Sequence, residues 1–227
     1  MNKKHITTIV CLAIISCILM FVIEQVLQTT YFVKTLAKIF VFLFIPIAYI
    51  RFVLKENILD FLNVKHVDLK RLRLGFLFGI AAIVIVITTF LLLQDYINTD
   101  DIISDLKTRL HITPEIYLFI AAYITFGNSL LEEFYFRGFI FLNIYQTNYK
   151  WFAYLFSAAL FAVYHVAIFA TWFNRWLILL ALVGLFIVGI IFNWLNTKSN
   201  NFLNSWLLHI LADIAVVSIG YYLFQAS

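Results

Sequence analysis

The sequence has few charged residues, and this scarcity excludes an ordinary soluble domain. Asp, Glu, Lys and Arg make up 12% of the 227 residues, while 64% are hydrophobic. Soluble domains are nearer a quarter charged, so this balance indicates a protein that lies largely in a lipid bilayer. The net charge is +4, but the basic residues are not interleaved in the manner of nucleic-acid-binding proteins. We therefore expect the bilayer as a partner, and no nucleic acid.

Cysteine is also scarce, and a disulfide between the two that are present is excluded. Cys11 and Cys17 lie in the same apolar run. Six residues apart on one helix, they point about 120° away from each other, which prevents an intrahelical bridge. We expect both to be small apolar packing residues.

Long apolar runs are abundant. About 20 apolar residues cross the roughly 30 Å of hydrocarbon in a bilayer. Seven runs qualify, at residues 6–23, 35–53, 74–93, 114–142, 151–169, 176–194 and 203–224. They are too long and too uniformly apolar for barrel strands, and backbone groups in lipid must be satisfied within the segment. The predicted fold is therefore all-α, a polytopic transmembrane helical bundle of about seven spans.

Lys and Arg indicate the orientation of these spans. With a cytoplasmic N-terminus, ten basic residues lie inside: Lys3, Lys4, Arg51, Lys55, Lys65, Lys70, Arg71, Arg73, Lys150 and Lys198. Five lie outside: Lys34, Lys38, Lys107, Arg109 and Arg175. The excess inside favours a cytoplasmic N-terminus, although Lys34 and Lys38 fall on the unfavoured side of this rule.

The two longest loops and one helix start carry local signals. Residues 55–72 alternate apolar and charged, which predicts an amphipathic helix on the cytoplasmic surface. Residues 95–112 contain four Asp residues and are predicted to form a solvated outer loop. The sequence Thr113-Pro114-Glu115 predicts a helix start, because it combines a capping hydroxyl, Pro at the first helical position and an acid in the first turn.

Six ionisable residues lie inside three of the predicted spans. Charges at membrane depth are costly and are functional candidates by default. They are Glu132, Glu133 and Arg137 in the fourth span, His165 in the fifth, and His209 and Asp213 in the seventh.

Helix geometry separates these residues by role. Arg137 follows Glu133 by four positions, the favoured arrangement for an ion pair. Glu132 is rotated about 100° from Glu133, so it is left without a counter-charge and is a candidate general base. His209 and Asp213 are four residues apart and share a helix face, whereas His165 must be brought to them by tertiary packing.

Three short motifs that contain these residues resemble those of a known family. Residues 132–137 read EExxxR, residues 161–165 read FxxxH and residues 209–213 read HxxxD. In this order, on separate hydrophobic helices over residues 114–220, they resemble the CPBP family. This is the group of CAAX proteases and bacteriocin-processing proteins, also called Abi. Each motif is weak alone, and three in order are strong together.

The resemblance implies an intramembrane peptidase acting on a membrane-associated peptide or protein. Residues 1–113 would supply N-terminal spans, and residues 114–227 would form the catalytic core. Glu132 would activate water, with Glu133 and Arg137 as a supporting pair. His165 would assist Glu132, while His209 and Asp213 would stabilise the developing oxyanion.

The last motif leaves the mechanism open. Many family members have Asn where this chain has Asp213, and an ionised Asp is a poor oxyanion donor. Asp213 must then be protonated, orient His209, or ligate a metal. In one mechanism zinc is held by ligands drawn from His165, His209, Glu132 and Asp213. In the other, Glu132 acts without a metal, which the absence of an HExxH sequence favours slightly.

Other interpretations use the same residues. Glu132, Glu133 and Arg137 could form a structural ion network, and intramembrane Glu, His and Asp could form the relay of an ion-coupled transporter. Only Pro46 interrupts a predicted span and the chain has seven Gly, which argues against the broken helices of transporters. A non-catalytic bacteriocin-immunity or scaffold protein is the third alternative. The short chain without an organelle signal predicts a multi-pass protein of a bacterial cell membrane.

Overall fold

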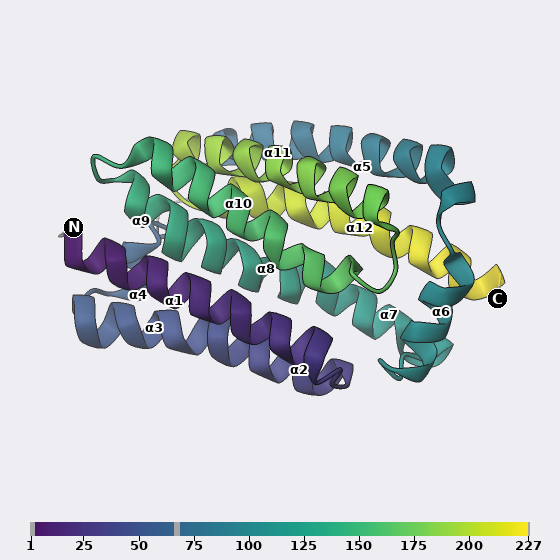
Figure 1. The fold of residues 1–227 in the computed structure, drawn as a ribbon. Helices are drawn as coiled ribbons and strands as arrows, with labels where there is room; N and C mark the ends of the chain where they lie inside the picture. The colour runs from purple at the N-terminus through teal and green to yellow at the C-terminus, as the bar shows by residue number, and fades with distance from the viewer. Residues whose placement is uncertain (1–2, 66–68, 227) are drawn as a thin grey trace.

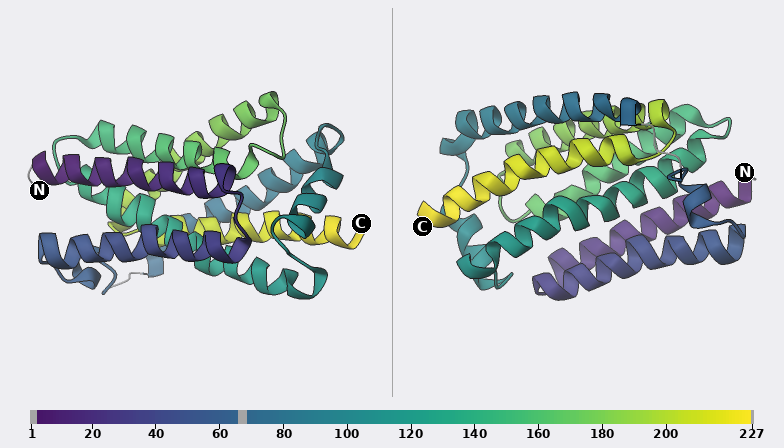
Figure 2. Two further views of the ribbon diagram at one scale, coloured as in Figure 1. Left: turned by 60° about the horizontal axis from the view of Figure 1, so that its bottom comes forward. Right: turned by 180° about the vertical axis from the view of Figure 1, so that it is seen from behind.

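The chain folds into an elongated bundle of helices. The structure is a computed structural model that describes residues 3–65 and 69–226. Every regular element in these ranges is helical, which confirms the predicted all-α class. The helices run roughly side by side, and the two chain termini lie at opposite ends of the bundle (Figures 1 and 2).

Five helices of the described part of the chain are long and apolar enough to cross a membrane. They are Lys3–Val26, Tyr31–Leu54, Arg73–Tyr96, Arg175–Ser199 and Leu203–Gln225. The first consists of α1 (Lys3–Phe21) and a π-helical turn, η1 (Val22–Val26). The second is built from α2 (Tyr31–Ile39), η2 (Phe40–Phe44), α3 (Ile45–Ala48) and η3 (Tyr49–Leu54). The others are α5 (Arg73–Leu93) with η5 (Gln94–Tyr96), α11 (Arg175–Ser199) and α12 (Leu203–Ala226).

These helices expose large apolar side chains to their surroundings. On α5 only Gly75 and Gly79 are buried, while Leu92 is 72% exposed. Such a surface is unfavourable in water and suits lipid. The chain is therefore a multi-pass membrane protein.

The other two predicted spans are helical as well. Residues 114–142 fall within α7 (Pro114–Ala122), η6 (Tyr123–Asn128), α8 (Ser129–Glu132), η7 (Glu133–Phe141) and α9 (Leu142–Tyr145). Residues 151–169 fall within α10 (Lys150–Phe169). The run from α7 to α9 begins at Pro114, as predicted, although the Thr113 side chain makes no capping hydrogen bond. The run lies between the α1–α3 layer and α10 (Figure 1). The count of seven spans stays a prediction.

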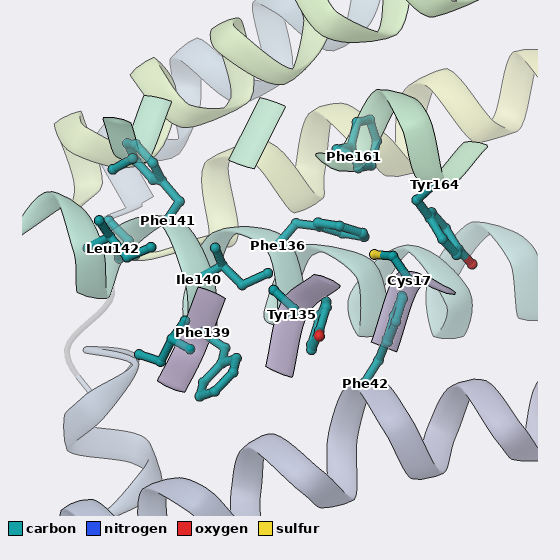
Figure 3. Packing of buried hydrophobic residues seen from close by; sticks show 14 of the residues in the cluster. Cys17, Phe42, Tyr135, Phe136, Phe139, Ile140, Phe141, Leu142, Phe161 and Tyr164 are labelled. Atoms are coloured by element: carbon teal, nitrogen blue, oxygen red, sulfur yellow. The ribbon is translucent and has the colours of Figure 1, made fainter. Parts of the chain in front are cut away.

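Aromatic packing fixes the middle of this central run. All residues of η7 are buried. Phe42 of η2 stacks on Tyr135 with ring centroids 4.1 Å apart, and Phe136 meets Phe161 of α10 edge-on at 5.4 Å (Figure 3). These contacts hold the N-terminal layer on one side of η7 and α10 on another, so the polar residues of η7 have fixed neighbours.

The predicted amphipathic helix over residues 55–72 is wrong as a continuous element. Only α4 (Ile58–Phe61) and a 3₁₀ turn, η4 (Leu69–Leu72), form, and residues 66–68 lie outside the described part. Asn63 has φ 51°, a left-handed conformation that ends the helix. Leu62 packs with Phe134 and Phe202, so this segment folds against the end of the bundle.

The predicted solvated loop at residues 95–112 is also wrong, because it contains the amphipathic helix α6 (Thr99–Thr108). Its Ile103 is buried in a cluster with Leu110, Ile112, Tyr117 and Phe224. The four Asp residues suggested solvent, but apolar residues between them form a buried face.

Polar contacts attach α6 and the residue after it to neighbouring segments. Asp105 accepts from Arg109 Nη2 at 2.6 Å and from Trp172 Nε1 at 2.8 Å. Burial opposes ionisation of Asp105, but these hydrogen bonds outweigh it and hold its pKa below the usual range. Arg109 and Lys34 both form ion pairs with Glu24, which is 5% exposed.

Candidate active site

Two successive glutamates lie at the centre of the bundle, where α8 meets η7. Glu132 is 1% exposed and Glu133 is fully buried. Carboxylates this deep require partners, because an isolated buried charge is very costly. The two side chains have different partners, which separates their roles.

Glu133 joins the arginine of its own helix to a histidine of α12. Its Oε1 accepts from Arg137 Nη1 at 3.1 Å, so the predicted ion pair is confirmed. The same oxygen lies 3.0 Å from Nδ1 of His209. Because a carboxylate only accepts, we assign the Nδ1 proton to His209, and the other nitrogen, Nε2, points away from Glu133.

Arg137 is held by aromatic rings as well as by Glu133. Its guanidinium carbon lies 3.9 Å from the centroid of Phe161 and 4.7 Å from that of Phe192. Among the described residues, Nε and Nη2 of Arg137 have no hydrogen-bond partner. The ring faces therefore supply the remaining stabilisation of this fully buried cation.

Glu132 brings the three motifs together. Its Oε2 lies 3.5 Å from Nε2 of His165 on α10 and 3.8 Å from Nε2 of His209 on α12. These separations are too long for direct hydrogen bonds of normal strength. Oε2 itself is buried and makes no hydrogen bond to the residues that the structure describes. One carboxylate oxygen from α8 thus faces two imidazole nitrogens from two other helices.

His165 is oriented by its own helix. Its Nδ1 lies 2.8 Å from the carbonyl oxygen of Phe161, so Nδ1 carries the proton and Nε2 is directed toward Glu132. The Phe161 ring packs beside the imidazole with centroids 4.3 Å apart, as its position one turn earlier predicted.

Asp213 faces the same nitrogen of His209 as Glu132 does. Its Oδ1 is 3.7 Å from His209 Nε2, and its side chain is 15% exposed, more than that of either histidine. The nitrogen on the opposite side of the ring is held by Glu133. Glu133 is therefore placed to orient the ring through Nδ1, whereas Asp213 lies beside Nε2.

A lysine that the sequence reasoning missed completes the surroundings of Glu132. Lys38 of α2 donates to Glu132 Oε1 at 3.0 Å and to Asn128 Oδ1 at 2.6 Å. Asn128 Nδ2 donates to the same Glu132 oxygen at 3.0 Å. The prediction that Glu132 has no counter-charge is wrong. From the sequence, Lys38 is predicted to lie outside the membrane. Two signals pointed instead to a buried residue: Lys38 lies within an apolar run, and it violates the preference of Lys and Arg for the cytoplasmic side.

The surroundings of Glu132 bear on the zinc mechanism. Among residues 3–65 and 69–226, no group of three or more His, Cys, Asp and Glu side chains is placed to hold a metal ion. In addition, the Lys38 ammonium already lies against Glu132, so a dication there would meet a like charge.

Residues 114–215 match the family model described as type II CAAX prenyl endopeptidase Rce1-like. This segment is a CPBP-family domain. The match spans all three motifs of the CPBP pattern, from Glu132 to Asp213, whereas Lys38 lies outside it. The same comparisons found no match to this chain among curated proteins or solved structures.

Proposed function

We propose that this protein is an intramembrane endopeptidase that hydrolyses a peptide bond of a membrane-associated peptide or protein. The observation that carries the proposal is the position of Glu132 Oε2, which is buried, without a hydrogen bond, and 3.5 and 3.8 Å from two imidazole nitrogens. The family match supports protease activity in general and gives no support to a transporter or a non-catalytic immunity protein.

The proposed reaction begins with a water molecule that contacts Glu132 Oε2 and His165 Nε2. Glu132 takes a proton from this water while the water oxygen attacks the scissile carbonyl carbon. His165, with the proton of Nδ1 held by the Phe161 carbonyl, accepts a hydrogen bond from the second O–H of the water at Nε2 and so positions the water. When the carbon–nitrogen bond breaks, Glu132 returns its proton to the leaving amine.

His209 and Asp213 are proposed to act on the carbonyl oxygen. His209 already donates from Nδ1 to Glu133, so protonation at Nε2 makes it an imidazolium with a second donor facing the site. A donor placed where negative charge develops stabilises the transition state. Asp213 Oδ1, 3.7 Å from this nitrogen, is placed to accept from it before substrate arrives.

We propose that the reaction does not require a metal. The Lys38 ammonium supplies the positive charge beside Glu132 that a zinc ion would otherwise provide. Protein freed of metal by chelation and checked by elemental analysis is expected to keep its peptide-cleaving rate within about twofold. A rate that falls with metal content and returns when zinc is added back would contradict this mechanism.

The substrate class is tested by mapping cleavage products. The matched family is described as acting on CAAX prenyl substrates, so a farnesylated peptide with a C-terminal CAAX sequence is the first probe. Membrane fractions provide the second, wider set of peptides and proteins. Wild-type protein in liposomes is expected to generate new C-termini that the Glu132→Gln variant does not. If neither probe yields products that distinguish the two proteins, the proposed function is wrong.

A further inference from the structure

One buried lysine outside the matched domain contacts the proposed base directly. We propose that Lys38 is a positioning residue for catalysis, which fixes the Glu132 carboxylate so that Oε2 faces the two histidines. This inference rests on the proposed function, because it assigns Lys38 a role at the same site. It also makes the N-terminal helical layer part of the active site, beyond residues 114–215.

The burial of Lys38 indicates that its charge interacts with specific partners. The residue is 7% exposed, and burying an ammonium group without compensation is costly. Its Nζ donates to Glu132 and Asn128 and lies 5.1 Å from the centroid of the Tyr164 ring. The partners on this lysine come from the central helical run and from α10, the two elements that also carry Glu132 and His165.

The hydrogen bonds fix the rotation of the carboxylate. Glu132 Oε1 accepts from both Lys38 and Asn128, whereas Oε2 accepts from neither. Rotating the carboxylate away from this orientation would break both bonds, so one oxygen of Glu132 is held on the side of His165 and His209. Asn128 alone cannot fix this arrangement as firmly, since its own amide oxygen is held by Lys38.

The position of α2 is itself fixed by packing next to Lys38. Phe42, four residues later, stacks on Tyr135 of η7. The ammonium therefore approaches Glu132 from a rigid element, which is the condition for accurate positioning of a catalytic group.

Lys34 offers a matched control on the same helix. It lies one turn before Lys38, is also largely buried, and pairs with Glu24 at 3.0 Å. Lys38→Met and Lys34→Met therefore remove the same charge from the same helix, but only Lys38→Met removes it from Glu132. The assay uses liposome-reconstituted protein and the peptide identified by product mapping.

Lys38→Met is expected to lower kcat by about 100-fold, because displacement of a catalytic group by about 1 Å costs this much. Its KM is expected to stay within about twofold, since the lysine is occupied by Glu132 and Asn128 and does not contact substrate. Lys34→Met is expected to keep kcat within about threefold. Rates are normalised to folded protein, so a loss of stability alone does not alter kcat.

A double-mutant cycle tests the Lys38–Glu132 pair without any substrate. Lys38→Met leaves a buried carboxylate without its counter-charge and is expected to lower the unfolding midpoint in detergent. Adding Glu132→Gln removes that charge and is expected to restore most of the loss, a coupling typical of directly contacting residues. Lys34→Met combined with Glu132→Gln is expected to be additive.

Three results would overturn the positioning role: a Lys38→Met kcat within threefold of wild type, a raised KM with unchanged kcat, or additivity in the Lys38–Glu132 cycle. Failure of the proposed function is recognised separately. If Glu132→Gln retains activity, the base assignment fails. If Glu132→Gln is inactive and Lys38→Met is fully active, only the role of Lys38 fails.

Discussion

Glu132→Gln is expected to lower kcat by about 1000-fold, within the range that loss of a general base produces. Gln keeps the shape of the side chain and can still accept from Lys38 and Asn128 through its amide oxygen, but it cannot take a proton from water. Steady-state cleavage of the mapped substrate, normalised to folded protein, measures this loss. The effect is expected in kcat, because the carboxylate acts on the attacking water.

Glu115→Gln is the control for this variant. Glu115 lies in the first turn of α7, in the same helical run as Glu132, but it is exposed. Its substitution is expected to leave kcat within about twofold. Equal losses in the two variants would mean that a change of charge anywhere in this run affects activity, and the assignment of Glu132 as the base would then have no support.

Arg137→Met is expected to destabilise the protein by about 3–5 kcal/mol, the range for breaking a buried ion pair by removing one partner. Glu133 would keep His209 as a partner but would lose the guanidinium with which it pairs. The Phe161 and Phe192 rings would lose the guanidinium against which they pack. Titration of unfolding in mixed micelles containing a denaturing detergent measures the change.

Arg51→Met provides the comparison for this loss, because Arg51 is exposed on η3. Its effect is expected to stay within about 0.5 kcal/mol, as is usual for surface substitutions. The Glu133→Gln and Arg137→Met double variant is expected to lose less unfolding free energy than the two single variants lose in total, since no buried carboxylate is left without a partner. A loss below about 1 kcal/mol for Arg137→Met would contradict a stabilising role of the pair.

Local patterns predicted much of the fold and part of the site. The helices follow from long apolar runs, and the Glu133–Arg137 pair follows from a spacing of four residues on one helix. The convergence of Glu132, His165 and His209 required the motif resemblance, because no helical period relates residues on different helices. The angular argument that separated Glu132 from Glu133 agrees with the structure, where they face opposite nitrogens of the His209 ring.

The wrong predictions concern residues whose environment is set by contacts between segments far apart in the sequence. Lys38 reaches Glu132 across 94 positions in the chain, so no local pattern connects them. At residues 55–72 the charge alternation suggested a membrane-surface helix, whereas burial of Leu62 draws the segment onto the bundle. In α6, the Asp residues concealed an apolar face that becomes visible only when Tyr117 and Phe224 are seen to cover it.

The most direct test of the central claim is the rate at which the mapped peptide acquires a labelled C-terminus in water enriched in ¹⁸O. The measurement compares wild-type and Glu132→Gln protein in liposomes at equal folded concentration. The account predicts that wild-type protein forms the ¹⁸O-labelled product, while Glu132→Gln forms it about 1000-fold more slowly. Labelled product formed by Glu132→Gln at the wild-type rate would contradict the account.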